Sequence, residues 1–170
     1  GRLKIRYSHE KVSLGTAGAV KAAIGKVASR TILVLNGDSY IEYDLEKFSQ
    51  AHLLTSASFS MLLARVLDSR RYGLVQINDR QQITGFLEKS TDAIGSPGLI
   101  NAGTYLIQRK VVEAFPPEIP LSIETNIIPT LVPSRVHGFV SEGRFIDIGT
   151  PASYLEAAEF FKELDLRERR

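Results

Sequence analysis

The sequence contains no cysteine and no tryptophan among its 170 residues. The absence of cysteine excludes a disulfide framework and a thiolate metal site, and it agrees with a reducing, cytoplasmic location. No apolar run approaches the ~20 residues of a membrane-spanning helix, and no signal-peptide pattern is present. The formal net charge is only +2, and no basic stripe with interleaved aromatic residues occurs. We therefore expect neither a membrane nor a nucleic acid among the partners of this chain.

What the chain does contain is the composition of a globular domain, with 44% apolar and 24% charged residues. Its length suits one domain with a core of its own. Strand-like and helix-like patterns alternate, which predicts an α/β fold with a mixed sheet. Strands are expected over residues 3–7, 31–35, 58–66, 72–77, 83–89, 104–107, 136–140 and 145–148. Helices are expected over residues 16–27, 44–54, 111–115, 122–131 and 150–164, with Tyr154, Leu155, Ala158, Phe161 and Leu164 forming a core-like face on the last one.

Residues 31–38, Thr-Ile-Leu-Val-Leu-Asn-Gly-Asp, form the stretch around which the rest is organised. The apolar run predicts a strand buried on both faces in the middle of a parallel sheet. Ligand crevices of open α/β sheets lie beyond the carboxyl ends of the strands, which would place Asp38 at a site. Asn36-Gly37 is also a hairpin signal, with residues 39–41 as the returning strand. The helical patterns on both flanks favour the site interpretation.

Polar groups stand at four strand ends or helix starts: Gly15-Thr16, Asp38, Glu88-Lys89 and Asp147. Each has an ordinary explanation, such as a helix entry capped by Thr16, a solvated ion pair, or a turn before a helix. Gathered at one crevice, they would suit a different task. Mg²⁺ takes one or two protein carboxylates together with substrate phosphates, and lysine is a point charge suited to phosphate.

A hydrolase interpretation rests on one pair only, Ser122 and Glu124. Nothing in the sequence supplies a base or an oxyanion loop for this pair. The three histidines, His9, His52 and His137, lie outside the motifs, and each is expected to be a surface residue or a hydrogen-bonded core residue. The sequence therefore disfavours hydrolysis.

Five ordered motifs resemble those of the sugar-1-phosphate nucleotidyltransferases. They are Leu-Gly-Thr-Ala-Gly (14–18), Val-Leu-Asn-Gly-Asp (34–38), Phe-Leu-Glu-Lys (86–89), Asn-Ala-Gly (101–103) and Phe-Ile-Asp-Ile-Gly-Thr-Pro (145–151). The resemblance covers residues 10–154 and is greatest to the bacterial mannose 1-phosphate and manno-heptose 1-phosphate guanylyltransferases. It implies one domain over residues 1–170, with a mixed, mostly parallel Rossmann-like sheet flanked by helices, as in glycosyltransferase-A-like folds.

The resemblance also implies an activity and a role for each matched position. The reaction would transfer a nucleotidyl group from an NTP, with GTP preferred, to a sugar 1-phosphate, giving an NDP-sugar and pyrophosphate. The implied roles are base contacts for Leu14, Gly15 and Thr16, Mg²⁺ ligation for Asp38 and Asp147, sugar contacts for Gly73, Glu88 and Asn101, and a sugar-phosphate contact for Lys89. Lys89 and Asp38 would be the catalytic residues.

The chain departs from the family at its N-terminal side. The family opens with a glycine-rich loop bearing Arg and then Lys, which cradles the triphosphate, and no stretch of this sequence matches it. We therefore expect an N-terminally truncated domain without the opening βαβ segment, whose free sheet edge would serve self-association or docking. The alternative function is a non-catalytic nucleotide-sugar-binding or regulatory module that has lost the triphosphate loop.

Overall fold

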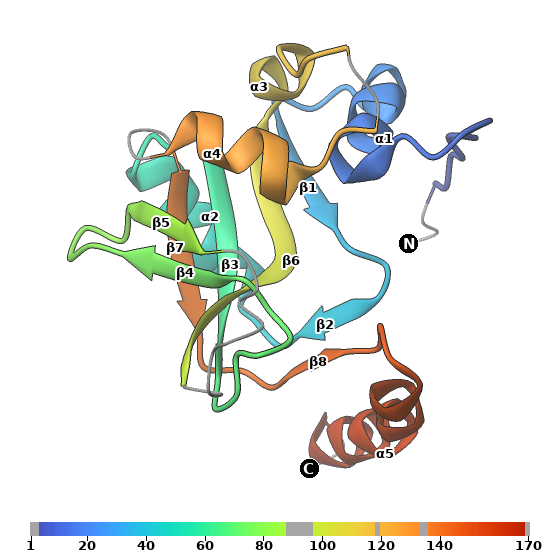
Figure 1. Cartoon of the computed structure of the whole chain (residues 1–170), viewed down its shortest axis with the longest axis vertical. Helices are drawn as coiled ribbons and strands as arrows, with labels where there is room; N and C mark the ends of the chain where they lie inside the picture. The colour runs from blue at the N-terminus through green and yellow to red at the C-terminus, as the bar shows by residue number, and fades with distance from the viewer. Residues whose placement is uncertain (1–3, 88–96, 118–119, 133–135, 169–170) are drawn as a thin grey trace.

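The computed structural model describes residues 4–87, 97–117, 120–132 and 136–168 (Figure 1). Within them, a six-stranded sheet has the order β5-β4-β6-β3-β7, and β1 pairs with the same edge of β6 as β4 does. A separate two-stranded sheet joins β2 (Ser39–Ile41) and β8 (Phe145–Asp147). The strands of the large sheet are β1 (Thr31–Leu35), β3 (Phe59–Val66), β4 (Leu74–Ile77), β5 (Ile83–Leu87), β6 (Gly98–Gln108) and β7 (Val136–Ser141).

The large sheet is mixed, as predicted. Strands β1, β3, β4 and β7 run in one direction, whereas β5 and β6 run in the other. Because β6 lies between β3 and the β1 and β4 strands, β3 and β7 are the only hydrogen-bonded parallel neighbours among the described strands. The predicted hairpin of β4 and β5 is present. The α/β class is therefore confirmed.

Three helical elements begin at a side chain that caps them. Asp44 accepts a hydrogen bond from Lys47 N (3.0 Å) and starts α2, and Ser122 accepts from the amides of the next turn and starts η2. Thr150 Oγ1 accepts from Ser153 N (3.2 Å) at the start of α5. The helical elements are α1 (Gly15–Ala23), η1 (Ile24–Lys26), α2 (Leu45–Leu54), α3 (Arg109–Glu113), η2 (Ile123–Ile127), α4 (Ile128–Leu131) and α5 (Pro151–Glu168).

Strand β3 divides the apolar core between the two faces of the sheet. Its residues Phe59, Met61 and Leu63 join a cluster that α1, α3, η2 and α4 cover, whereas Leu62 and Ala64 join a smaller cluster with α2 (Figure 1). This alternation follows from the two-residue period of a strand that is covered on both faces. None of the helices in the described ranges is long and apolar enough to cross a membrane.

Strand β1 is not the doubly buried middle strand that its apolar run predicts. Within the described residues it pairs only with β6, in antiparallel register from Thr31 opposite Gln108 to Leu35 opposite Thr104. Leu33 and Leu35 are 37% and 58% exposed. The prediction is wrong because an apolar run does not reveal whether other elements cover both faces and both edges of the strand. The hairpin alternative is also wrong, since β2 pairs with β8 and not with β1.

Three smaller predictions differ from the structure. Residues 4–7 form no strand, and Ile5 and Tyr7 are exposed because no described strand lies alongside them. Strand β6 begins at Gly98, before the predicted residue 104, because it pairs there with β3 and β4. Leu45 and Phe48 are both expected on the inward face of the 44–54 helix, but Leu45 is 47% exposed and only Phe48 of the two is buried.

The predicted core face of α5 is mostly exposed to solvent. Tyr154 and Leu155 are 66% and 77% exposed, while Leu164 is buried as predicted. The reason is that α5 lies against the small β2·β8 sheet, where Tyr40 meets Phe160 edge-on at a ring-centroid separation of 6.0 Å. A two-stranded sheet covers only a narrow stripe of a helix. Periodicity identified an apolar face, but not the extent of the surface that covers it.

Candidate functional site

A cleft of about 630 Å³ opens where β1 and β4 separate along the edge of β6. It is lined by residues from six separate parts of the chain: Asp38, Arg71, Tyr72, Gly73, Phe86, Asn101, Glu124, Thr125, Asp147, Gly149 and Thr150. Four of the predicted site residues are among them, namely Asp38, Gly73, Asn101 and Asp147. The structure thus brings these four together, and their roles stay predictions.

An irregularity in β6 shapes the floor of this cleft. Met61 pairs with Tyr105 and Leu63 with Asn101, so β6 advances by four residues where β3 advances by two. At the centre of this bulge Gly103 has a φ of +73°, a backbone conformation that favours glycine. Asn36 N donates to Gly103 O (2.8 Å), which fixes the end of β1 against the bulge. The bulge therefore sets Asn101 and the chain before Asp38 side by side.

The two predicted metal-binding carboxylates lie at neighbouring positions in the small sheet. Ser39 pairs with Asp147, and Ile148 N donates to Asp38 O (2.8 Å). The Asp38 side chain is exposed and makes no hydrogen bond or ion pair with another described residue, whereas Asp147 is partly buried. Carboxylates 109 positions apart in sequence thus line one cleft, because β2 and β8 are strand partners.

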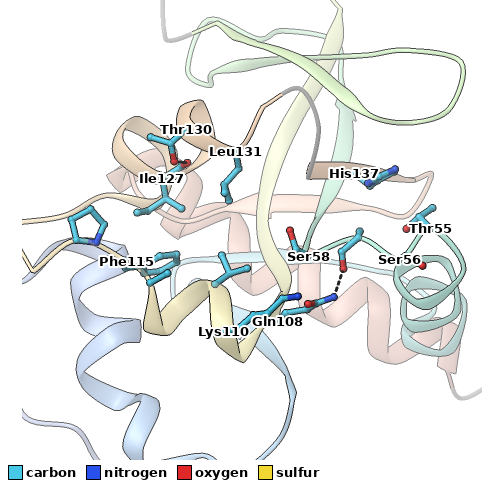
Figure 2. Close-up of a pocket in the computed structure, with 14 residues that line it drawn as sticks. Thr55, Ser56, Ser58, Gln108, Lys110, Phe115, Ile127, Thr130, Leu131 and His137 are labelled. Carbon is cyan, nitrogen blue, oxygen red and sulfur yellow. Dashed lines mark hydrogen bonds between the residues drawn. The ribbon is translucent and has the colours of Figure 1, made fainter.

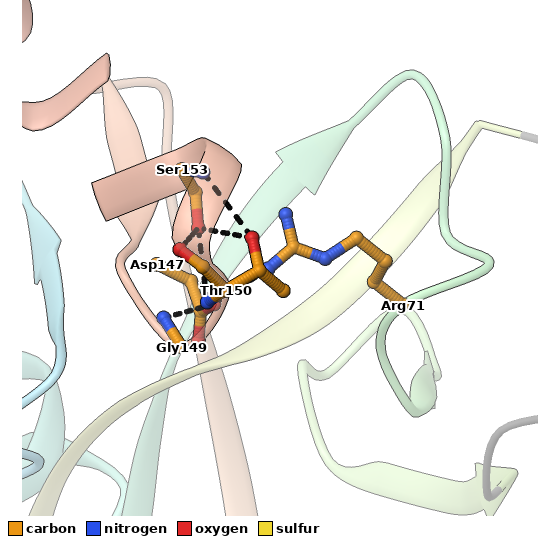
Figure 3. A network of polar contacts seen from close by, with 5 residues as sticks. All are labelled: Arg71, Asp147, Gly149, Thr150 and Ser153. Carbon is orange, nitrogen blue, oxygen red and sulfur yellow. Dashed lines mark hydrogen bonds and ion pairs between the residues drawn. The ribbon is translucent and has the colours of Figure 1, made fainter. Parts of the chain in front are cut away.

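Asp147 is held by an arginine and a backbone amide (Figure 3). Its Oδ1 accepts from Arg71 Nη2 (2.9 Å) and from Gly149 N (3.1 Å). The Arg71 guanidinium carbon also lies 5.5 Å from the centre of the Tyr72 ring. Burial raises the pKa of the Tyr72 hydroxyl, so Tyr72 is neutral at physiological pH. Arg71 thus adds a guanidinium to the cleft wall, paired with Asp147, that the motifs did not predict.

A chain of hydrogen bonds leads from Asn101 to the predicted nucleotide turn. Asn101 Nδ2 donates to the Tyr105 hydroxyl (2.7 Å), which donates to Glu124 Oε1 (2.8 Å). Thr16 Oγ1 donates to Glu124 Oε2 (3.1 Å) and accepts from Ile123 N (2.8 Å). Burial, and secondarily the Glu124 carboxylate, raise the pKa of Tyr105 well above its ordinary value. The Glu124 carboxylate therefore links Asn101, through Tyr105, to Thr16 of the predicted nucleotide turn.

The predicted nucleotide turn does not line the cleft itself, but it packs against the segment that does. Leu14 O accepts from Leu121 N (2.8 Å), and Leu121 O accepts from Ala17 N (2.8 Å). A Cβ on Gly15 would lie 2.6 Å from Leu121 O, so glycine is required here by the approach of a neighbouring backbone. The N-cap of α1 is Leu14, and Thr16 is inside the helix. The interpretation of Thr16 as N-cap is therefore wrong.

Two predicted site residues, Glu88 and Lys89, lie outside the described residues. All other predicted site residues lie in the described ranges. The structure also adds two functional candidates that the motifs did not include, Arg71 and Glu124. Arg71 could have been noticed as the cation two positions before Gly73. Glu124 was considered only as half of a hydrolase pair, and no local pattern reveals its partner Tyr105, 19 residues away.

The hydrolase interpretation fails on geometry. Ser122 Oγ accepts from Glu124 N and Thr125 N and donates to Glu124 Oε2 (2.8 Å), so it is a helix cap. No histidine lines the described cleft. His52 Nδ1 lies 2.8 Å from Ser60 Oγ inside the core, which confirms that it is a hydrogen-bonded core residue. His137 Nδ1 is buried with no hydrogen-bond partner in the described part of the chain.

A second cavity, of about 500 Å³, lies between α3, α4 and the N-terminal end of β3 (Figure 2). Lys110, Gln108, Ser58 and His137 line it, and Gln108 Nε2 donates to Ala57 O (2.9 Å). Its described lining includes no carboxylate and none of the predicted site residues. The predicted site residues that line either of these two cavities therefore all lie in the first cleft.

A sequence model of the nucleotidyl transferase family matches residues 1–163. The chain belongs to this family. Among its relatives, this nucleotidyl transferase is 31% identical to the mannose-1-phosphate guanylyltransferase of Mycobacterium tuberculosis, over 92% of this chain and 44% of that protein. It is 31% identical to the D-glycero-alpha-D-manno-heptose 1-phosphate guanylyltransferase of Aneurinibacillus thermoaerophilus, over 91% of this chain and 66% of that protein.

Solved structures of the family have the same fold. The crystal structure of HddC from Yersinia pseudotuberculosis superposes with a TM-score of 0.77 and is 33% identical, covering 89% of this chain and 64% of that one. HddC has also been crystallised in complex with GMP-PN, with the same TM-score. The nucleotidyl transferase chain described here thus spans about half to two thirds of the length of the relatives it matches.

Proposed function

We propose that the protein transfers a nucleotidyl group from an NTP to a sugar 1-phosphate, giving an NDP-sugar and pyrophosphate. One observation carries the proposal: β2 and β8 bring Asp38 and Asp147 into the cleft that also contains Gly73 and Asn101. Each of these four residues comes from a different motif or segment. Family membership supports the reaction type, and the guanylyltransferase relatives support GTP as the nucleotide and mannose or manno-heptose 1-phosphate as the acceptor.

The donor set fits a divalent cation, for which Mg²⁺ is the proposed identity. Two carboxylates at one cleft wall, with room for phosphate oxygens, are the ligands that Mg²⁺ prefers. A cation held by Asp38 and Asp147 would neutralise phosphate charge in the cleft. No cluster of three or more metal-ligating side chains occurs in the described ranges. Substrate oxygens and water would complete the coordination of a cation held by the two carboxylates.

The protein's own residues would act by positioning and charge. A sugar 1-phosphate has a second pKa near 6 and is largely dianionic at neutral pH, so it attacks the α-phosphorus without a general base. The absence of histidine from the lining of the described cleft agrees with this. Asn101 would orient the sugar, Lys89 would hold its phosphate, and the turn of Leu14, Gly15 and Thr16 would face the base. Pyrophosphate leaves as the new phosphoanhydride bond forms.

The decisive experiment measures pyrophosphate release by the complete encoded protein. GTP, ATP, UTP and dTTP are each offered with mannose 1-phosphate or manno-heptose 1-phosphate, with Mg²⁺ and with a chelator. Turnover that requires the metal and prefers GTP supports the proposal. Calorimetric binding of GDP-mannose without any turnover would instead support the non-catalytic nucleotide-sugar-binding or regulatory module. Binding of neither nucleotide nor nucleotide sugar would refute both.

Two further expectations remain part of this proposal. The exposed edge of β1, with Leu33 and Leu35 on its surface, supports self-association or docking there. Sedimentation of the wild type against a Leu35→Lys variant tests it, because a charge at a sheet edge disfavours strand pairing. The cytoplasmic location likewise remains a proposal, which fractionation of cells expressing the tagged protein would test.

A further inference from the structure

We infer that Glu124 is a positioning residue that ties the nucleotide turn to the sugar-contacting Asn101, so that the two substrates are held in one fixed relation. The inference rests on the proposed function. Its carboxylate joins two hydrogen-bonded arms, Thr16 on one side and Tyr105 with Asn101 on the other. Thr16 and Glu124 are 108 residues apart in sequence, so the link is a product of the fold.

All three side-chain donors to Glu124 are neutral hydroxyls. Oε1 accepts from Tyr105, and Oε2 accepts from Ser122 (2.8 Å) and Thr16 (3.1 Å). Within the described ranges no lysine, arginine or histidine forms an ion pair with this carboxylate. Hydrogen bonds to an ionised acceptor are shorter and stronger than bonds between neutral groups. Among the described residues, the Glu124 carboxylate therefore binds and orients hydroxyl groups.

The Tyr105 arm fixes the orientation of the Asn101 amide. Tyr105 is fully buried, so its proton stays on the hydroxyl and points to Glu124. The Tyr105 oxygen is then left to accept from Asn101 Nδ2, and Asn101 Oδ1 accepts from Gly103 N (3.0 Å). Both ends of the amide are held, which presents one defined edge of Asn101 to the cleft.

The Thr16 arm fixes the turn at the start of α1. Because Thr16 Oγ1 accepts from Ile123 N, its own proton is directed to Glu124. The neighbouring backbone of Leu121 binds Leu14 O and Ala17 N. The segment that carries Glu124 is thus the segment on which the nucleotide turn rests, so a change at Glu124 reaches both arms.

Glutamine cannot replace Glu124 in this position without loss. If its oxygen accepts from Tyr105, its NH₂ group faces the Ser122 and Thr16 hydroxyls, which both donate in the present arrangement. If the amide is reversed, the NH₂ group meets the Tyr105 hydroxyl. That hydroxyl already accepts from Asn101. Glu124→Gln is therefore a same-shape change that breaks the coupling while preserving packing.

The test is steady-state kinetics on the complete encoded protein, with KM measured separately for GTP and for mannose 1-phosphate. We expect Tyr105→Phe to raise the KM for the sugar phosphate about fivefold and to leave the KM for GTP within about twofold, because it cuts one arm only. We expect Glu124→Gln to raise both KM values roughly tenfold. Tyr43→Phe and Glu113→Gln, which make the same chemical changes away from the cleft, are the matched controls.

A merely structural Glu124 gives a different result. Loss of folded protein would lower kcat in Tyr105→Phe and Glu124→Gln alike and leave every KM unchanged, which would overturn the inference. So would a change confined to one substrate in Glu124→Gln. If the wild type binds both ligands without turnover, the proposed reaction fails. The effects of the variants on GTP and on mannose 1-phosphate are then measured as changes in calorimetric affinity. If it binds neither, the reaction and the inference both fail.

Discussion

Replacing Gly103 with alanine is expected to lower the free energy of unfolding by about 2–4 kcal/mol. Gly103 has a φ of +73°, and a left-handed backbone costs an L-residue roughly 1–2 kcal/mol. A Cβ would lie 2.7 Å from both Asn36 Nδ2 and Ser39 Oγ, so these side chains must move. Moving Ser39 breaks its hydrogen bond to Ala102 O, at a cost of about 1 kcal/mol. For a chain of this size, the total corresponds to a Tm lower by roughly 4–16 °C.

Urea and thermal denaturation measure the effect, with Gly37→Ala as the matched control. Gly37 lies between Asn36 and Ser39, and no described atom lies within 4 Å of a Cβ built on it, so its replacement should change stability by less than about 0.5 kcal/mol. The double variant Gly103→Ala/Ser39→Ala removes one of the two close atoms and should recover part of the loss. A Gly103→Ala protein as stable as the wild type would refute the close contact of Asn36 and Ser39 with β6 at this bulge.

Three other predictions concern the cleft and the core. Asp38→Asn should lower kcat/KM in the complete protein at least a hundredfold, roughly 3 kcal/mol. The Tm should stay nearly unchanged because Asp38 is exposed. A loss of activity that merely follows a loss of folded protein would contradict the metal role. Lys89→Ala and Lys89→Arg should each lower kcat/KM for the sugar 1-phosphate roughly tenfold to a hundredfold, and wild-type turnover in Lys89→Ala would mean a solvated ion pair. Burial lowers the pKa of both His52 and His137, so at mildly acidic pH the unfolded chain binds more protons than the folded chain does. The free energy of unfolding should therefore fall as the pH drops below about 6.5, and a flat urea-denaturation profile from about pH 7.5 to 5.5 would contradict this.

Two of the predicted cleft residues, Asp38 and Asp147, follow or end an apolar run, and the ends of these runs meet in the fold. Local pattern is enough to single out these two positions, because each motif is contiguous. Asn101 lies within β6, and only the family resemblance predicted it. What pattern does not contain is which strands are neighbours. The burial of β1 was therefore predicted wrongly, although its residues 31–35 were predicted correctly.

The residues that sequence reasoning missed depend on contacts between distant segments. Glu124 is a candidate only because it accepts hydrogen bonds from Thr16 and Tyr105. Arg71 is a candidate only because it binds Asp147, 76 residues further along the chain. A carboxylate on a short helix and an arginine in a loop are ordinary surface residues when they are read alone. The glycine turn is a related case. The family resemblance assigned base contacts to it, and the structure adds a packing reason for Gly15, because the backbone of Leu121 approaches it closely.

The position of β6 has a consequence for how the chain folds. Its partners β1, β3 and β4 all precede it in sequence, and Thr31 pairs with Gln108 across 77 positions (108 − 31). During synthesis these strands leave the ribosome with unpaired edges, and the sheet closes only when β6 is available. Such long-range pairing slows folding and exposes strand edges to aggregation in the meantime. Because Asn101 and Tyr105 lie on β6 itself, the cleft cannot form before β6 has joined the sheet.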